Sequence, residues 1–263
     1  MKFASRRAIQ GLLILVPPSS VLDTGFGHFR TDELQYNSLL REAQQLRGRV
    51  YLEDGAVDFR EILPDGRLIH PDDERSWHLL VMNDDGAVAG CARYIPHDEG
   101  VAFSELGVAR SALAHSRPWG ESLRRAVEAE RVKARHLGIS FAEVGGWALA
   151  QELRYSSAAL EIFTNVCALA KFFGGAVAIT TATFRHHSSS ILRRLGGRVL
   201  VNEEGIELPS YFDPQYKCEM EILRFDTDSP NSRYRPRIEQ CLRNLATVPA
   251  ISATSITAAY AMS

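Results

Sequence analysis

Residues 141–199 contain the strongest candidates for a reactive site. The apolar strand expected at 141–149 contains one carboxylate, Glu143, and the pair Gly145-Gly146 lies two residues further on. A glycine inside a strand usually marks a bulge or a place where something approaches the backbone closely. A carboxylate at such a place is either a salt-bridged structural residue or a group that exchanges protons with a bound molecule.

The segments that follow Glu143 predict a unit of loop, helix, strand and helix. The expected helix at 158–173 has apolar residues at steps of three and four, and the expected strand at 176–184 is rich in β-branched residues. The unit consists of a polar loop (154–157), the helix (158–173), a glycine pair that ends it (174–175), the strand (176–184), three serines expected to cap a helix (188–190) and that helix (191–195).

We expect the rest of the chain to form elements that support this unit. Helical spacing predicts a first helix at 32–47, which we expect to run into an extended segment containing Arg47, Val50 and Tyr51. The remaining predicted elements are a long loop (53–76), a hairpin (77–82 and 87–95), an amphipathic helix (120–137), two strands (198–201 and 217–225) and a helix (235–245).

Composition narrows the class of protein. The 263 residues are 45% hydrophobic, as in an ordinary soluble core. The 30 basic and 32 acidic side chains are interspersed and give a net charge of −2, so no basic block indicates nucleic-acid binding. The four cysteines have no short spacing and no paired histidines, which argues against a zinc site and a disulfide framework. We therefore expect no metal and a reducing, cytoplasmic location.

The two ends of the chain are expected to lie outside the main domain. The apolar run at 11–16 is too short to span a bilayer, so we interpret 1–29 as a flexible N-terminal extension and expect no transmembrane segment. Residues 226–263 are expected to form a C-terminal helix and a disordered Thr/Ser/Ala tail. The functional domain is then expected at 30–225.

The order of elements resembles that of the GNAT acyltransferases. This resemblance implies an α/β (α+β) fold in which a mixed, mostly antiparallel sheet is flanked by helices and splayed between the strands at 141–149 and 176–184. In that family a loop at a helix start binds the donor's pyrophosphate or phosphopantetheine arm on backbone N–H groups, a normal anion site. Two loops here are similar to it, at 117–122 and 154–159, and the second is preferred because it follows the strand at the expected distance.

Within the superfamily the chain resembles the autoinducer synthases and the long-chain N-acyl amino acid synthases over about residues 34–225. Arg47 with Val50 and Tyr51 is similar to their segment after the first helix, residues 90–94 (Gly-Cys-Ala-Arg-Tyr) to their Gly-Cys-x-Arg strand, and Glu143 to their strand glutamate. The homoserine-lactone synthases carry an arginine three residues after that glutamate, where this chain has Gly146. Together with the helix at 120–137, this departure favours an amino acid or another small amine as acceptor.

The resemblance implies a role for each matching residue. Glu143 would accept a proton from the attacking ammonium, and Arg93 and Arg47 would bind the acceptor carboxylate. The implied sites are catalytic (Glu143, Arg93), donor-binding (Gly145, Gly146, Trp147, Arg154, Ser156, Ser157, Ala158) and acceptor-binding (Arg47, Tyr51, Arg93). The implied donor is acyl-CoA or the acyl-phosphopantetheine of acyl carrier protein, which would then be a partner.

Two other functions remain open from the sequence. One is an acetyl-CoA-dependent N-acetyltransferase, which differs in having a short acyl pocket, and the other is a non-catalytic module that binds an acyl ligand or carrier protein. Structural interpretations also remain for single residues: Arg93 can pair with Asp72 or Asp73, and His186 and His187 suit a solvated turn. Residues 211–216 suit a packed aromatic turn, and Cys91 and Cys167 suit inert core positions.

Overall fold

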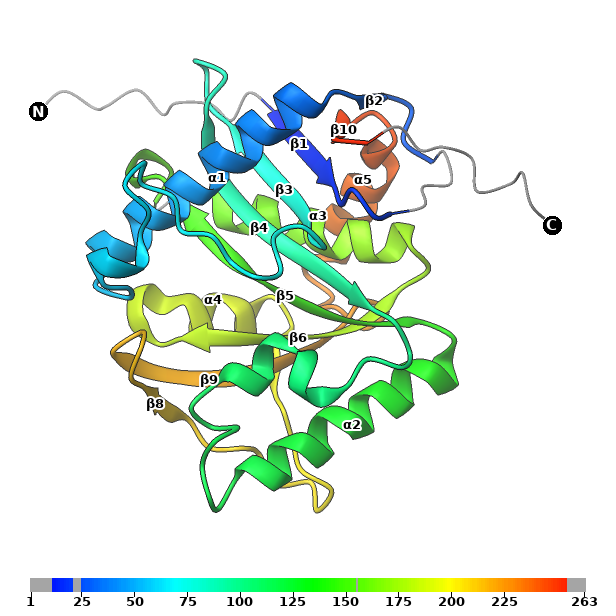
Figure 1. Cartoon of the computed structure of the whole chain (residues 1–263). Coiled ribbons are helices and arrows are strands. Elements are labelled where there is room, and N and C mark those ends of the chain that lie inside the picture. Colours follow the sequence, from blue (N-terminus) through cyan, green and yellow to red (C-terminus); the bar gives the residue numbers. More distant parts are fainter. Residues whose placement is uncertain (1–10, 21–24, 155, 255–263) are drawn as a thin grey trace, which may run out of the picture.

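Apolar, β-branched runs form one mixed sheet in residues 11–20, 25–154 and 156–254, which are the residues described by the computed structural model (Figure 1). Its order is β2-β10-β1-β3-β4-β5-β6-β9-β7, with β8 also paired to β9, and six of the nine pairings are antiparallel. The strands are β1 (Gly11–Val16), β2 (Phe29–Thr31), β3 (Trp77–Met82), β4 (Val88–His97), β5 (Ser140–Leu149), β6 (Ala176–Thr183), β7 (Arg198–Val199), β8 (Tyr211–Asp213), β9 (Cys218–Asp226) and β10 (Ala250–Ser252). The expected mixed, mostly antiparallel sheet is confirmed.

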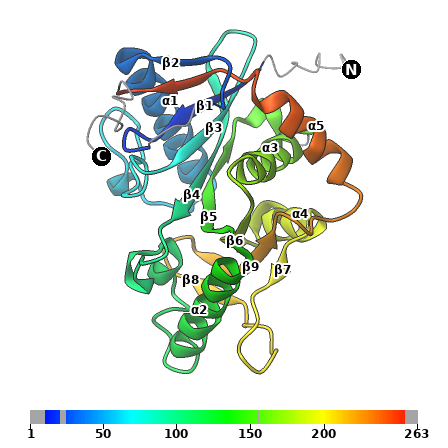
Figure 2. The same ribbon diagram turned by 90° about the vertical axis from the view of Figure 1, so that its right-hand side faces the viewer.

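Helices cover both faces of this sheet. The helices are α1 (Glu33–Glu53), α2 (Gly120–Leu137), α3 (Ala158–Phe172), α4 (Ser188–Arg194) and α5 (Arg235–Leu245). Figure 2 shows α1 and α2 on one face and α3, α4 and α5 on the other. Two 3₁₀ turns, η2 (Phe103–Glu105) and η3 (Gly107–Arg110), lie on the same side as α2.

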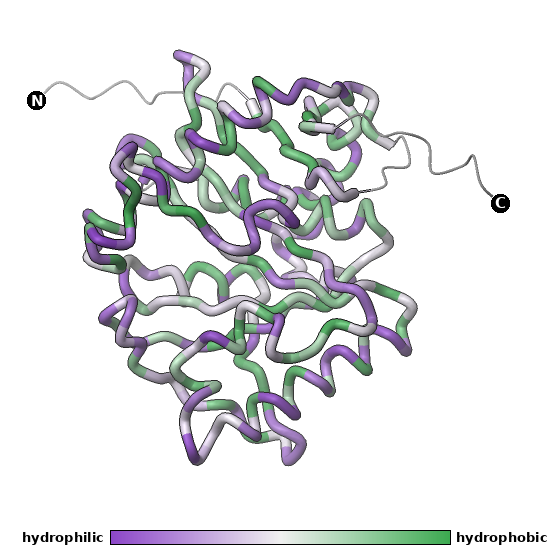
Figure 3. The backbone as a smooth tube through the Cα atoms, viewed as in Figure 1, coloured by the Kyte–Doolittle hydropathy of each residue, from purple (hydrophilic) through white to green (hydrophobic). Residues whose placement is uncertain are grey.

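Side chains on opposite faces of β5, β6 and β9 belong to two different apolar cores. On β6, Ala176 and Ala178 belong to the larger core with α1 and α3, whereas Val177 and Ile179 belong to the smaller core with α2. This alternation follows from the two-residue period of a strand. Figure 3 shows hydrophobic stretches along the strands and alternating hydrophilic and hydrophobic residues along α2, which is amphipathic as expected.

The sheet opens between its two central parallel strands. β5 and β6 pair only over the first four residues of each, from Ser140 opposite Ala176 to Glu143 opposite Ile179. Beyond Glu143, β5 stays paired with β4, and β6 stays paired with β9. The strands therefore diverge as expected, and the space between them is the place where a ligand can reach backbone groups in the middle of the sheet.

The first helix is longer than predicted, and Arg47, Val50 and Tyr51 lie on it rather than on an extended segment. The helical period continues past residue 47 because Leu46 and Val50 are both buried, and α1 ends only at Asp54, whose backbone N–H bonds the Val50 carbonyl. Arg47 and Tyr51 are thus four residues apart on one helical face.

The expected flexible extension and disordered tail are wrong for two segments, because both supply buried strands. β1 pairs antiparallel with β3 and parallel with β10, and β10 pairs in turn with β2. Burial of Ile14, Leu15, Ala250 and Ile251 explains the pairing, since these side chains fill the larger core. Residues 1–10, 21–24 and 255–263, to which those expectations also apply, lie outside the described residues.

Two smaller predictions are corrected on the C-terminal side. The serines at 188–190 form the first turn of α4 instead of capping it, and His187 precedes them with a left-handed φ of 61°. Residues 211–213, expected in a packed turn, form β8 and pair with β9. The turn occupies only residues 214–217, which join β8 to β9.

Candidate active site

A cavity of about 850 Å³ opens where β5 and β6 separate. Its walls come from α1, the loop before β3, η3, α3, α4 and the β8–β9 turn. The predicted site residues that line it are Arg47, Tyr51, Arg93, Glu143, Gly145, Gly146, Trp147, Arg154 and Ser156, whereas Ser157 and Ala158 are not among the lining residues. One space thus collects side chains from positions more than a hundred residues apart.

A β-bulge in β5 lies in the middle of the cavity wall. Arg93 of β4 pairs with Gly145 and Cys91 pairs with Ala148, so β5 holds one residue more than β4 between these points. Gly146 adopts a φ of 63°, and a Cβ there would lie 2.5 Å from the Nε of Arg93, so only glycine fits. The bulge leaves a backbone amide without a ladder partner and reverses the alternation of the following side chains.

The side of the cavity toward α3 and α4 is apolar. After the bulge, Trp147 stacks on Phe163 of α3 with 6.2 Å between the ring centroids. The same part of the cavity is lined by Ile191 and Leu192 of α4 and by Leu195, which directly follows α4. We call this part the apolar arm; its aromatic and aliphatic walls suit a hydrocarbon group.

The opposite side contains two buried arginines that share one carboxylate. Arg47 NH2 lies 2.6 Å from Asp73 Oδ2, and Arg93 NH1 lies 3.2 Å from Asp73 Oδ1, with guanidinium side chains only 2% and 8% exposed. Burial raises the pKa of Asp73, but the charges of Arg47 and Arg93 outweigh it and hold the pKa at about 2. We call these three residues the buried network; it carries one positive charge in excess.

Several donors of the buried network have no partner among the described residues. They are Nε and NH1 of Arg47 and Nε of Arg93, each buried from solvent. Both oxygens of Asp73 are already occupied. Oδ1 accepts from Arg93, and Oδ2 accepts from Gln44 and the His70 backbone N–H as well as from Arg47. Spare N–H donors on an excess positive charge suit a bound carboxylate.

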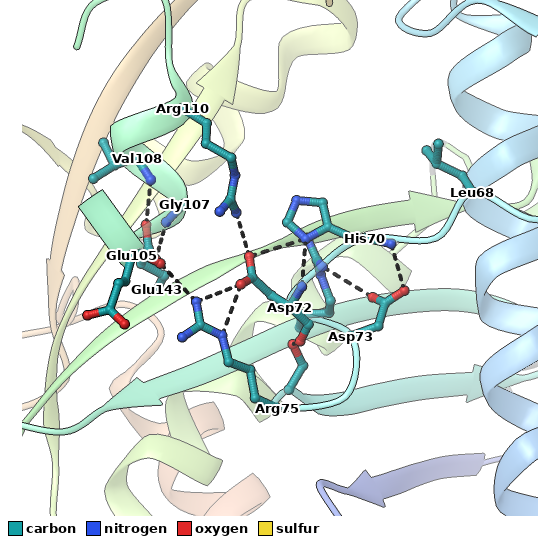
Figure 4. Close-up of polar contacts among 12 residues, drawn as sticks. Leu68, His70, Asp72, Asp73, Arg75, Glu105, Gly107, Val108, Arg110 and Glu143 are labelled. Atoms are coloured by element: carbon teal, nitrogen blue, oxygen red, sulfur yellow. Dashed lines mark hydrogen bonds and ion pairs between the residues drawn. The ribbon is translucent and has the colours of Figure 1, made fainter. Parts of the chain in front are cut away.

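Figure 4 shows a second cluster of charges, of which Asp72 and Arg110 line the cavity. Asp72 accepts hydrogen bonds from Arg75 and from Arg110 of η3, whose side chains are 39% and 44% exposed. Burial alone would raise the pKa of Asp72, but hydrogen bonds from His70 and Arg75 and the charge of Arg110 hold it well below its usual range. We call Asp72, Arg75 and Arg110 the rim network.

Glu143 lies at the last β5–β6 pair, where the two strands begin to diverge, and its carboxylate is held in place by hydrogen bonds (Figure 4). Its carboxylate accepts the backbone N–H of Gly107 and of Val108, each at 2.7 Å, and lies 3.0 Å from His97 Nε2. A Cβ at Gly107 would lie 3.2 Å from Oε1, so a larger residue there would crowd the carboxylate. A carboxylate has about four lone-pair sites, so three donors leave one site for a molecule in the cavity.

The loop before α3 borders the cavity, but its side chains have partners within the protein. Arg154 pairs with Asp54 at the end of α1 (3.3 Å), Ser156 Oγ accepts the N–H of Ala158, and Ser157 Oγ donates to Glu161. Tyr155 lies outside the described residues. The alternative loop at 117–122 lines no part of the cavity; instead Gly120 packs against the Ala114 carbonyl, which a Cβ would meet at 2.4 Å.

Some residues of the site were not predicted from the sequence. His97, Gly107 and Val108 hold Glu143, and Asp213 with Tyr216 lines the floor of the cavity. The sequence held no signal for Asp213: Tyr211, Phe212 and Asp213 do not alternate between apolar and polar, and only the structure shows them buried, exposed and buried as in a strand. His187, expected in a solvated turn, also borders the cavity, whereas Cys91 and Cys167 are buried as expected.

The described residues contain neither a metal cluster nor a membrane-spanning helix. No three His, Cys, Asp or Glu side chains converge there in a way that could hold a metal ion. None of the helices in residues 11–20, 25–154 and 156–254 has the length and apolar character needed to cross a bilayer.

Comparisons with known proteins place this arrangement among solved folds. No protein-family model matches the sequence, and no curated protein matches it significantly. The CoA-dependent acyl-homoserine lactone synthase BjaI, solved with SAM and isopentyl-CoA, aligns over 92% of this chain and 92% of its own at 16% identity and a TM-score of 0.54. BjaI solved with MTA aligns over 86% and 92% at 15% identity and a TM-score of 0.53.

A third solved structure aligns more weakly. FeeM, an N-acyl amino acid synthase from uncultured soil microbes, aligns over 75% of this chain and 88% of its own, with 14% identity and a TM-score of 0.48. The likeness to BjaI shows a shared fold, the GNAT fold that the order of elements predicts.

Proposed function

We propose that the protein is an N-acyltransferase that moves an acyl group from a thioester donor to the amine of an amino acid or a related small amine. The observation that carries the proposal is the cavity itself, which joins the apolar arm, the bulge at Gly145-Gly146 and the buried network in one space. These three parts correspond to an acyl group, a thioester carbonyl and an acceptor carboxylate. The solved structure of BjaI with SAM and isopentyl-CoA supports the same pairing of substrates on this fold.

The donor would approach from the side of α3 and α4. The unpaired amide of the bulge suits an oxyanion hole, since a backbone N–H held in place needs no reorganisation as the carbonyl gains charge. The phosphate of acyl-CoA or of the phosphopantetheine of acyl carrier protein would lie near Arg154, Ser156, Ser157 and the start of α3 at Ala158. The apolar arm favours an acyl group longer than acetyl, because Trp147, Phe163 and Leu192 offer far more apolar surface than two carbons cover.

The acceptor would bind at the buried network, with Tyr51 beside it. The spare N–H groups of Arg47 and Arg93 suit a carboxylate, and Arg93 also touches the bulge where the thioester would lie. Glu143, with one free lone-pair site, would accept the proton that the attacking ammonium must lose, directly or through water. His97 would keep the Glu143 carboxylate in place during this transfer.

The proposal is tested by mass spectrometry of organic extracts from a bacterium that expresses the chain, followed by turnover measurements on the purified protein. We expect new N-acyl amines in the extracts and, for Glu143→Gln, a fall in turnover of about a hundredfold or more with donor affinity unchanged. Glu121→Gln on the exposed face of α2 is the matched control and should keep full turnover. Extracts without new acyl amines and no thioester consumption in vitro would contradict the proposed activity.

A further inference from the structure

Asp213 is a buried carboxylate on the floor of the cavity with one oxygen to spare. It lies at the end of β8 and is 8% exposed. Its Oδ1 accepts the backbone N–H of Gln215 at 3.0 Å and of Tyr216 at 3.1 Å, which closes the β8–β9 turn. No described residue donates a hydrogen bond to Oδ2 or forms an ion pair with Asp213, although the residue lines the cavity.

The nearby arginines of the protein are already engaged elsewhere. Arg47 and Arg93 share Asp73, and Arg185, whose charge acts on the neighbouring Cys218, donates to the backbone carbonyls of Asp54 and Lys217. A buried carboxylate without a cation is costly, because burial removes the hydration that stabilises its charge. A cation supplied by a ligand would offset that cost.

Tyr216 links Asp213 to the acceptor side of the cavity. Its ring lies edge-on to Tyr51 of α1, with centroids 6.2 Å apart, and Tyr51 is one helical turn from Arg47. Burial raises the pKa of the Tyr216 phenol, and the charges of Arg93, Asp213 and Arg47 all act on it. Arg47, Arg93 and Asp213 thus line the same cavity, and the charges of all three act on the one Tyr216 phenol.

We infer that Asp213 binds the ammonium of a zwitterionic acceptor whose carboxylate binds Arg47 and Arg93. This inference rests on the proposed function and narrows it, because it requires one amine and one carboxylate in the same small molecule. An amine without a carboxylate would leave the guanidinium donors unmatched, and a carboxylic acid without an amine would leave Asp213 unmatched. The aromatic rings of Tyr51 and Tyr216 line the same cavity.

Calorimetry on the purified full chain tests this subsite without any turnover. Each of the twenty common amino acids is titrated, and the tightest is compared with its desamino carboxylic acid. We expect the amino acid to bind the wild type about tenfold or more tightly than the desamino acid, the size of a hydrogen bond between charged groups. Equal binding of the two, or no binding of any amino acid, would overturn the inference, and this comparison needs no variant.

Asp213→Asn sharpens the test, because Asn keeps the Oδ1 that closes the turn and replaces Oδ2 by an NH₂ donor. The variant should lose the preference for the amino acid while it keeps its affinity for the desamino acid. Asp84→Asn, the same change in the exposed turn of the β3–β4 hairpin, should behave as wild type. A folded Asp213→Asn protein that still prefers the amino acid would overturn the inference. Failure of the proposed acyl transfer is measured separately: the protein would then consume no thioester with any amino acid as acceptor.

Discussion

Asp72 and Asp73 follow one another in the chain, but each collects arginines from a different part of the molecule. Asp72 belongs to the rim network, in which half-exposed arginines donate hydrogen bonds to Asp72 and, from Arg75, to the Glu105 carbonyl. Asp73 holds the buried network, in which two enclosed arginines share one carboxylate and keep spare donors. The difference is that the rim network joins the loop before β3 to η3 and the Glu105 carbonyl, whereas the buried network keeps N–H donors that no described residue uses.

Removal of the shared carboxylate should have the largest effect. Asp73→Asn leaves two buried guanidinium groups without a counter-charge, so we expect the free energy of unfolding to fall by about 3–5 kcal/mol. Denaturant titration measures this loss, and a decrease below about 1 kcal/mol would show that water or ions reach the buried network freely. Asp65→Asn, whose partner Arg67 is on the surface, is the control.

The buried network should also make stability depend on pH through His78. Burial, with the charge of Arg47, lowers the pKa of His78 from 6.5 to about 4. The unfolded chain then takes up a proton near pH 6.5 that the folded protein refuses until about pH 4, so acidification across this window favours unfolding by about 3 kcal/mol. Unfolding curves at several pH values should show this slope for wild type and for His115→Gln, an exposed control. His78→Gln should flatten it; an unaltered slope would mean that other groups cause it.

Substitution of one buried arginine should separate binding from stability. Arg93→Lys keeps a positive charge near Asp73 but loses the planar fork, so we expect the KM for the acceptor to rise tenfold or more. The free energy of unfolding should fall by less than in Asp73→Asn, because Lys keeps a positive charge near Asp73 and Arg47 still pairs with it. Steady-state kinetics compare this variant with Arg75→Lys of the rim network. Similar KM values for the two would erase the distinction between the networks.

Loss of a rim contact should have the smallest effect. Arg75→Gln removes a cation whose side chain is 39% exposed, so the free energy of unfolding should fall by no more than about 1 kcal/mol. The difference from wild type should shrink further in about 1 M salt, where screening acts within a few ångströms. A larger loss that salt does not reduce would show that the rim network is shielded from solvent.

The sequence predicted local elements well and long-range assembly less well. The helices at 120–137 and 235–245 match α2 and α5, because each has a clear stop or start signal and an apolar face. The bulge was also predicted, since a glycine pair inside a strand has few other uses. By contrast, β1 and β10 are short and pair with segments far apart in sequence, so local pattern alone cannot reveal them.

The same limit applies to the candidate site. Arg47, Arg93 and Glu143 were predicted from a motif resemblance, and the cavity brings them together. Which aspartate pairs with Arg93 could not be decided from the sequence, because Asp72 and Asp73 are adjacent and their side chains point to different networks. Asp213 was missed because its importance depends on the path of a turn that only tertiary contacts fix.

The pairing of β1 with β10 sets a condition on synthesis of the chain. On the ribosome, β1 is made before β3, and its neighbour on the other side is made only when residues 250–252 have been translated. Until then one edge of β1 is open, and β2 has no partner strand at all. A chain that stops before residue 250 would keep every residue of the proposed site, yet it would expose an apolar strand edge of the kind that pairs with other chains. Its expected fate is aggregation rather than a merely inactive fold.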